Sequence, residues 1–133
     1  MTRLQFSRTG SHYFIPVSLN VGIGSLVVRA LVDTGASKCG VPVGVNNSYF
    51  HLLVVGRDEG VKTATLPQGL EFIRIPKIVV MQETNIAGIF QETEIQEQNV
   101  ETWLTGDQII IGMNFLNKYD VTMTRNGTMI IEN

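Results

Sequence analysis

The apolar residues of this chain occur in short runs, or alternate with polar residues, and Gly, Pro or Asn separates one run from the next. This spacing is typical of the strands of a compact all-β domain, and the long periodicity of amphipathic helices is missing from the sequence. The 133 residues, 44% of them hydrophobic and 17% charged, are enough to form one buried core. We therefore expect a single all-β domain over residues 1–133.

The charge balance and the cysteine content exclude several classes of protein. The net charge is -2 and the Lys and Arg residues are scattered, so the sequence has no basic patch for nucleic acid. No apolar run approaches the ~20 residues that a membrane span requires, and we expect no membrane partner. With one cysteine, Cys39, and no apolar secretory signal at the start, the chain is expected in the reducing cytoplasm.

Glycine, proline and asparagine mark three expected hairpins. The sequence VGIG at 21–24 predicts a turn between strands at 12–20 and 25–33. Residues 61–65 and 70–80 predict a long projecting hairpin with the tip LPQG at 66–69. The Asn126-Gly127 pair predicts a type I′ turn near the end of the chain.

Two segments are harder to interpret. Residues 46–55 fit either a short strand or a helical turn. Residues 78–117 contain several acidic residues but neither Lys nor Arg, which favours a solvated acidic edge or loop over a site for a basic partner.

Two stretches share one arrangement, ALVDTGA at 30–36 and QIIIGMN at 108–114. Each brings three apolar residues into a bend that contains glycine, which suggests a duplicated strand and turn. A carboxylate such as Asp33 is costly at a buried strand end unless it has a role there. Taken alone, Asp33 is best explained as a turn residue followed by Gly35, but the second stretch and the central hairpin make the combination far more specific.

With these motifs, residues 31–37 and 109–116, the chain resembles the retropepsin-like aspartic proteases, the family of retroviral and retroelement proteases with bacterial and cellular relatives. The resemblance covers about residues 13–131. The residues that match the second motif are Ile110, Ile111, Gly112, Asn114 and Leu116. The residues in the place of that family's substrate-covering flap are Thr63, Ala64, Thr65, Leu66, Pro67, Gln68 and Gly69.

The resemblance implies a closed acid-protease barrel with one lobe per chain. Because the sequence has a single Asp-Thr-Gly, it also implies a homodimer in which the Asp33 residues of two copies meet at a two-fold axis. Residues 1–10 would form a flexible arm or a strand of the dimer. The expected substrate is a peptide or protein cleaved between apolar residues, and no metal or other cofactor is implied.

The family's chemistry implies a role for each residue of the first motif. Two carboxyls ~4 Å apart at an effective dielectric near 20 repel by ~4 kcal/mol, so one stays protonated while the other is ionised and activates water. Asp33 would supply these carboxyls, the hydroxyl of Thr34 would lock the two loops together, and Gly35 would leave room for the substrate. Ala36 would line the floor, and Ser37 would either hydrogen-bond nearby backbone or cap the bend.

Family members differ at the position of Ala36. A hydroxyl there could donate to the carboxylate and favour its charged form, so with Ala36 we expect activity in the mildly acidic range.

The sequence departs from the retroviral members of the family in three ways. Met113 stands where they commonly have an Arg that braces the dimer, the flap tip lacks their multiple glycines, and residues 82–107 form a longer segment than a minimal member needs.

Alternative hypotheses stay open at this point. The chain could be a catalytically silent retropepsin-like module for peptide binding or dimerisation, or a generic β-barrel in which Asp-Thr-Gly has no catalytic role. Cys39 could be a nucleophile with His12 or His51, but no cysteine-protease signature surrounds it, and a buried thiol is the better interpretation.

Overall fold

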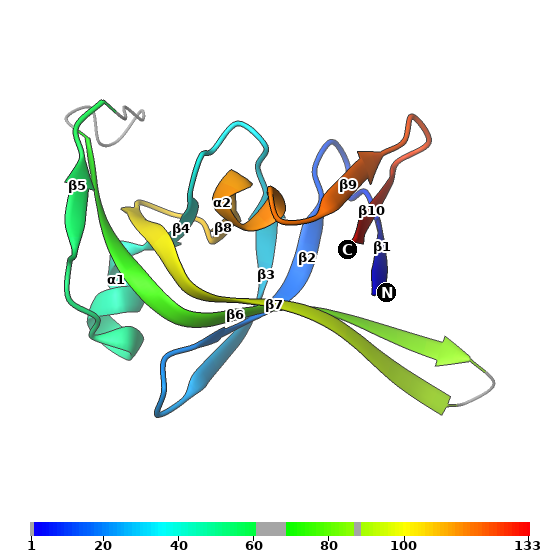
Figure 1. Cartoon of the computed structure of the whole chain (residues 1–133), viewed down its shortest axis with the longest axis horizontal. Coiled ribbons are helices and arrows are strands. Elements are labelled where there is room, and N and C mark those ends of the chain that lie inside the picture. The colour runs from blue at the N-terminus through cyan, green and yellow to red at the C-terminus, as the bar shows by residue number, and fades with distance from the viewer. Residues whose placement is uncertain (1, 61–68, 87–88) are drawn as a thin grey trace.

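A computed structural model of the chain describes the backbone of residues 2–60, 69–86 and 89–133, and the side chains of these residues outside 83–93. The described residues are mostly β-strand, as the sequence predicts (Figure 1). The elements in chain order are β1 (Arg3–Ser7), β2 (Phe14–Asn20), β3 (Ser25–Val32), β4 (Cys39–Pro42), α1 (Val43–Val45), η1 (Asn46–Phe50), β5 (Gly56–Asp58), β6 (Leu70–Ile86), β7 (Ile89–Thr105), β8 (Ile110–Ile111), α2 (Met113–Leu116), β9 (Asp120–Met123) and β10 (Thr128–Glu132).

The strands of the described residues form two sheets. The larger has the order β2-β3-β8-β4-β7-β6-β5. β2 also pairs antiparallel with β6, so the strands from β2 to β6 form a ring of hydrogen-bonded neighbours. The smaller sheet has the order β1-β10-β9. Its buried residues Leu4, Met129 and Ile131 belong to the same apolar cluster as Ile15, Ile75 and the other buried residues of the large sheet. One core therefore holds both sheets together.

Within residues 1–10, where we expected a flexible arm or a strand for the dimer, β1 pairs with β10 of the same chain. The amide of the Gln82 side chain also binds the outer edge of β1: Gln5 N donates to Gln82 Oε1 over 2.7 Å, and Gln82 Nε2 donates to the carbonyl oxygen of Gln5. The described part of this segment is thus held within the chain. A role for the small sheet in a dimer stays a prediction.

The hairpin expected at residues 21–24 is present. β2 and β3 pair antiparallel from Phe14–Leu31 to Asn20–Ser25, and Val21 N donates to Gly24 O over 3.0 Å. Gly22 has φ +96°, a conformation that favours glycine. The undecided segment after residue 45 begins with the helical turn η1 and not with a strand.

The C-terminal hairpin is also present, but the expected turn type is wrong. Type I′ needs positive φ at both central residues, whereas only Gly127, with φ +89°, has it and Asn126 does not. Gly127 N donates to Thr124 O over 3.2 Å, and Thr124 N donates to Thr128 O over 2.8 Å. The hairpin therefore has the other common geometry, a turn followed by a glycine in the left-handed conformation that forms a β-bulge.

Residues 78–117, expected as a solvated acidic edge or loop, are largely strand, and most of their acidic residues lie on β7. β6 continues to Ile86 and pairs with β7 from Phe72–Trp103 to Ile86–Ile89, so the two form a hairpin that crosses the molecule (Figure 1). Some of the acidic side chains are paired inside the chain: Glu97 lies 3.8 Å from Lys118 Nζ, and Glu101 lies 3.5 Å from Lys38 Nζ. The acidic stretch is therefore part of the sheet, where pairing with β6 outweighs its polar composition.

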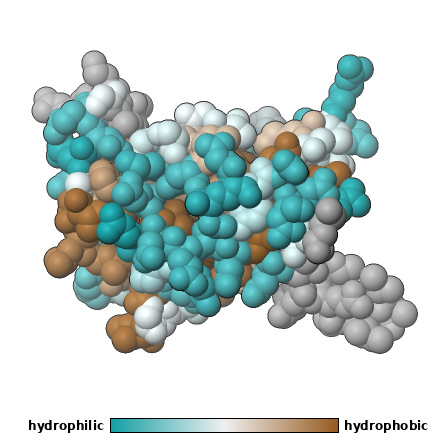
Figure 2. Space-filling model, in the orientation of Figure 1, coloured by the Kyte–Doolittle hydropathy of each residue, from teal (hydrophilic) through white to brown (hydrophobic). Residues whose placement is uncertain are grey.

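The strand expected at residues 61–65 lies outside the described residues. The strand that pairs with the beginning of β6 is β5, in the register Gly56–Phe72 to Asp58–Leu70. Several apolar side chains are exposed around α1, η1 and the segment before β5, and brown surface appears on that side of the molecule in Figure 2. These residues are Val43, Tyr49, Leu53, Val54 and Val55. No helix among the described residues has both the length and the apolar character to cross a membrane.

Candidate active site

The two stretches with a shared arrangement lie side by side. β3 and β8 pair in parallel, with Leu31 opposite Ile110 and Val32 opposite Ile111. Backbone bonds extend this pairing beyond the strands, because Leu31 N donates to Ile109 O over 2.8 Å and Asp33 N donates to Ile111 O over 3.0 Å. The end of the apolar run before Asp33 is thus fixed against the second motif.

Asp33 begins a tight turn in which its side chain takes part. Gly35 N donates to Asp33 Oδ1 over 2.9 Å, and Ala36 N donates to Asp33 O over 3.2 Å. A Cβ on Gly35 would lie 3.2 Å from Asp33 Oδ1, so glycine lets the amide approach the carboxylate closely. Asp33 is half-buried, whereas Thr34, Gly35 and Ser37 are exposed on the single chain. The turn presents one carboxylate at the surface with one of its oxygens held by a backbone amide.

The second motif supports this turn from below. Met113 N donates to Ala36 O over 2.8 Å, and Asn114 N donates to Ser37 O over 3.1 Å. Gly112 is buried against the loop, and a Cβ there would lie 2.2 Å from Lys38 O. Only glycine fits at this contact.

Asn114 connects three elements through its side chain. Its Oδ1 accepts from Cys39 N over 2.9 Å, and its Nδ2 donates to Glu101 O over 2.7 Å. The amide therefore joins α2 to β4 and β7 at the point where the Asp33 loop ends. Ile111 and Leu116 of the same motif are buried in the core, and Ile110 is half-buried.

Cys39 is a buried thiol, as the sequence favours. Burial raises its pKa to about 11, and Gly112 N donates to its sulfur over 3.5 Å. A thiolate is the nucleophilic form of cysteine, so this environment is unsuited to nucleophilic catalysis.

Most of the flap residues expected from the sequence lie outside the described residues. These are Thr63, Ala64, Thr65, Leu66, Pro67 and Gln68. Gly69 is described: it has φ +100°, and a Cβ there would lie 2.7 Å from Asp58 O. This glycine therefore stands where the chain returns close to the end of β5.

A shallow apolar hollow lies beside the turn. It is lined by Thr34, Met113, Leu116, Val121 and Met123. Met123 is 45% exposed, although it is a large apolar side chain next to the Asp-Thr-Gly turn. An apolar surface at this position is suited to contact with another protein surface.

A polar cluster that no sequence pattern indicated begins in the Asp33 loop. Lys38 Nζ lies 2.5 Å from Asp58 Oδ2, and Trp103 Nε1 donates to the same oxygen over 2.7 Å. These two bonds, that of Lys38 first, hold the pKa of Asp58 below its usual value. Trp103 is buried, as a core residue is expected to be. Among the described residues, no group of three or more His, Cys, Asp or Glu side chains is arranged to hold a metal ion.

The fold resembles the crystal structure of a retropepsin-like aspartic protease from Rickettsia conorii, with a TM-score of 0.63. The two chains are 14% identical, and the alignment covers 97% of this chain and 89% of that chain. No protein-family model and no curated protein sequence matches the chain. The similarity shows a retropepsin-like fold, as the two motifs indicated.

Proposed function

We propose that this chain is one subunit of a homodimeric aspartic-type endopeptidase. The observation that carries the proposal is the position of Asp33, a half-buried carboxylate at the start of a turn that β3, β8 and the second motif hold in place. In the retropepsin-like fold, one chain supplies one such carboxylate. Hydrolysis by this mechanism needs two, so a second copy completes the site.

The reaction follows from two carboxyls that share one proton. The ionised Asp33 takes a proton from water as the water oxygen attacks the peptide carbonyl carbon, and the protonated Asp33 of the second copy donates to the carbonyl oxygen. The tetrahedral intermediate then collapses: a proton passes to the amide nitrogen and the C–N bond breaks. The products are a new carboxyl group and a new amino group, and no cofactor is consumed.

Two observations support a dimer built around this turn. Thr34 and Gly35 are exposed on the single chain, and the apolar hollow that includes Thr34, Met113 and Met123 lies next to them. In the assembly that we propose, a second copy covers this surface and brings its own Asp33 to the axis. The ring of pairings through β2, β3, β8, β4, β7 and β6 supports a closed barrel in each subunit.

Turnover of peptides tests the proposal. The purified protein is incubated with a diverse peptide pool between about pH 4 and about pH 7, with and without pepstatin, beside Asp33→Asn and a matched control, Glu94→Gln. Glu94 is exposed on β7, so its substitution removes one carboxylate away from the turn. Cleavage by the wild type and Glu94→Gln, with none by Asp33→Asn, is expected. No cleavage by a verified dimer at any pH would contradict the enzyme and favour a silent peptide-binding module.

A further inference from the structure

Lys38 follows Asp33 in the same loop and directly precedes β4. Its backbone lies against the second motif, because Lys38 O is the atom that a Cβ on Gly112 would meet at 2.2 Å. Its side chain is only 18% exposed. The main chain of this lysine is thus part of the support for the Asp33 turn, while its side chain points elsewhere.

The side chain reaches Asp58 on β5, at the far edge of the sheet. β7 and β6 stand between β4 and β5 in the sheet order, yet Lys38 Nζ lies 2.5 Å from Asp58 Oδ2. It also lies 3.5 Å from Glu101 Oε1 on β7 and 4.0 Å from the ring centre of Phe72 on β6. One ammonium group, from the loop before β4, therefore contacts residues of β5, β6 and β7.

Two aromatic side chains contact this ion pair, Phe72 through the ammonium group and Trp103 through the carboxylate. Phe72 and Trp103 are directly opposite each other on β6 and β7, and Gly56 and Gly40 flank them on β5 and β4. A Cβ on Gly56 would lie 2.4 Å from Phe72 Cζ, so the glycine makes room for the ring. Trp103 Nε1 also donates to Asp58 Oδ2, which gives that oxygen two donors.

Such an arrangement differs from an ordinary surface ion pair. Exposed ion pairs contribute little to the stability of the fold. Here the Lys38 side chain is mostly buried and lies over the Phe72 ring, and its acceptor, Asp58 Oδ2, also accepts from the indole N–H of Trp103. Removing one partner would leave Asp58 or Lys38 without its main counter-charge. The pair therefore fixes the distance between β5 and the Asp33 loop more strongly than a solvated bridge could.

We propose that Lys38 is a positioning residue, which through Asp58 holds β5 at a set distance from the Asp33 turn. β5 and β6 flank the residues that the resemblance assigns to the substrate-covering flap, so we assign β5 to one wall of the peptide-binding site. This inference rests on the proposed function, because it assigns a role within the same site. An extended peptide gains affinity from walls that are already in place when it arrives. Loss of the link should weaken peptide binding more than it slows the chemical step at Asp33.

Steady-state kinetics on the full chain test the role of Lys38. Lys38→Met is expected to raise KM about tenfold and to leave kcat within about twofold, whereas Lys38→Arg, which keeps a positive charge over the ring, should raise KM less than Lys38→Met does. In the Lys38→Met background, Asp58→Asn should add little, because the two residues act as one unit. An unchanged KM in Lys38→Met, or fully additive effects of the two substitutions, would overturn the proposal.

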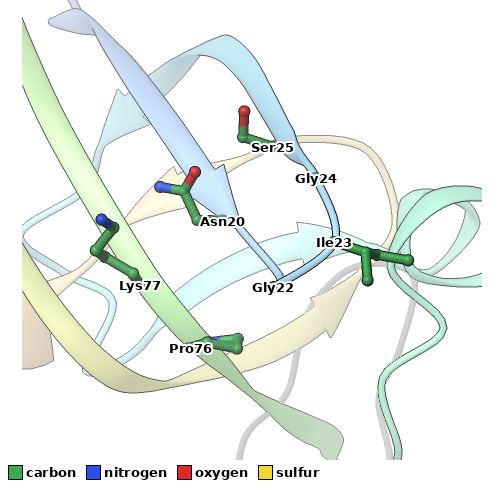
Figure 3. Close-up of a pocket in the computed structure, with 7 residues that line it drawn as sticks. All are labelled: Asn20, Gly22, Ile23, Gly24, Ser25, Pro76 and Lys77. Atoms are coloured by element: carbon green, nitrogen blue, oxygen red, sulfur yellow. The ribbon is translucent and has the colours of Figure 1, made fainter.

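A matched control is Lys77→Met. Lys77 lies opposite Asn20 on β2, in a hollow beside the turn at residues 21–24, which is at the other end of β3 from Asp33 (Figure 3). Its substitution removes one positive charge without touching the Lys38 contacts. KM of this variant should match the wild type, and a rise equal to that of Lys38→Met would show a general effect of charge.

A second readout does not depend on activity. Trp103 is the single tryptophan, and its indole N–H binds the carboxylate that Lys38 holds. Lys38→Met should shift the fluorescence emission of Trp103 more than Lys38→Arg does, and Lys77→Met should not shift it. If the wild type cleaves no peptide, the proposed function fails, and the emission comparison still decides whether Lys38 positions Asp58: identical emission in Lys38→Met and wild type would refute the link.

Discussion

The backbone amide of Asp33 donates a hydrogen bond to the carbonyl oxygen of Ile111 over 3.0 Å. This bond continues the parallel pairing of β3 with β8 past the end of both strands. It joins two segments that are distant in the sequence and sets the direction in which the chain leaves β3. The position of the Asp33 carboxylate therefore depends on the second motif as much as on its own loop.

Gly112→Ala should disrupt this support. The new Cβ would lie 2.2 Å from Lys38 O, a backbone atom that cannot move without moving the Asp33 loop. We expect the free energy of unfolding to fall by about 3 kcal/mol or more, measured by urea denaturation. Gly24→Ala is the control: Gly24 has open space around it, so a change within about 0.5 kcal/mol is expected. Equal effects of the two substitutions would contradict the close contact.

Asn114→Ala should leave two backbone groups without a partner, the N–H of Cys39 and the carbonyl of Glu101. Each such group costs about 1–3 kcal/mol when it is not exposed to water, and we expect a loss in this range or above it in thermal or urea unfolding. The control is Asn117→Ala, which changes the exposed asparagine that follows α2 and should be nearly neutral. A neutral Asn114→Ala would show that water replaces both bonds.

Much of this arrangement could be predicted from the sequence. The glycine-bounded hairpin around residues 21–24 and the match between ALVDTGA and QIIIGMN are local patterns, and both correspond to paired strands. The strand nature of residues 89–98 could not be predicted, because this stretch is polar and contains three Glu residues, a type depleted in strands, and only the pairing with β6 overrides that tendency.

The link from Lys38 to Asp58 could not be predicted from local sequence patterns either. It depends on the order of β4, β7, β6 and β5 in the sheet and on the direction of a long side chain across them. The spacing of residues in the sequence does not show the order of strands in a sheet. The turn at Asn126-Gly127 shows a smaller limit, since one dipeptide fits more than one hairpin geometry.

Asp58 should make the fold sensitive to acid. Its pKa is lowered in the folded state, first by the hydrogen bond from Lys38 and then by that from Trp103. A carboxyl with a depressed pKa adds stability above its unfolded value of 3.8, and that stability is lost as the pH falls through the folded value. The wild type should therefore lose more free energy of unfolding than Asp58→Asn when the pH is lowered from about 5 to about 2.

Urea denaturation at a series of pH values measures this difference. Glu59→Gln is the control, because Glu59 is exposed and pairs with Arg57 at the surface, where an ion pair contributes little. Its pH dependence should follow that of the wild type. Parallel curves for wild type and Asp58→Asn would show that the Lys38 bond does not stabilise the ionised carboxylate.

Cys39 should be unreactive in the folded protein. The thiol is 1% exposed and burial raises its pKa from 9.0 to about 11, so thiol reagents at about pH 8 should label it only after unfolding. Because the folded state favours the protonated thiol, its contribution to stability is complete below pH 9.0 and declines as the pH rises toward about 11. Cys39→Ala should lack this alkaline decline. Rapid labelling of the native protein would contradict the buried position.

The central claim is that two copies of Asp33 form one active site, and subunit mixing tests it most directly. Wild-type protein at fixed concentration is allowed to exchange subunits with increasing amounts of Asp33→Asn, and peptide cleavage is measured at each ratio. If only dimers with two Asp33 residues are active, an equal amount of Asp33→Asn lowers the activity to about one half, and a roughly ninefold excess to about one tenth. Activity that stays constant at every ratio, with exchange verified, would contradict a shared site.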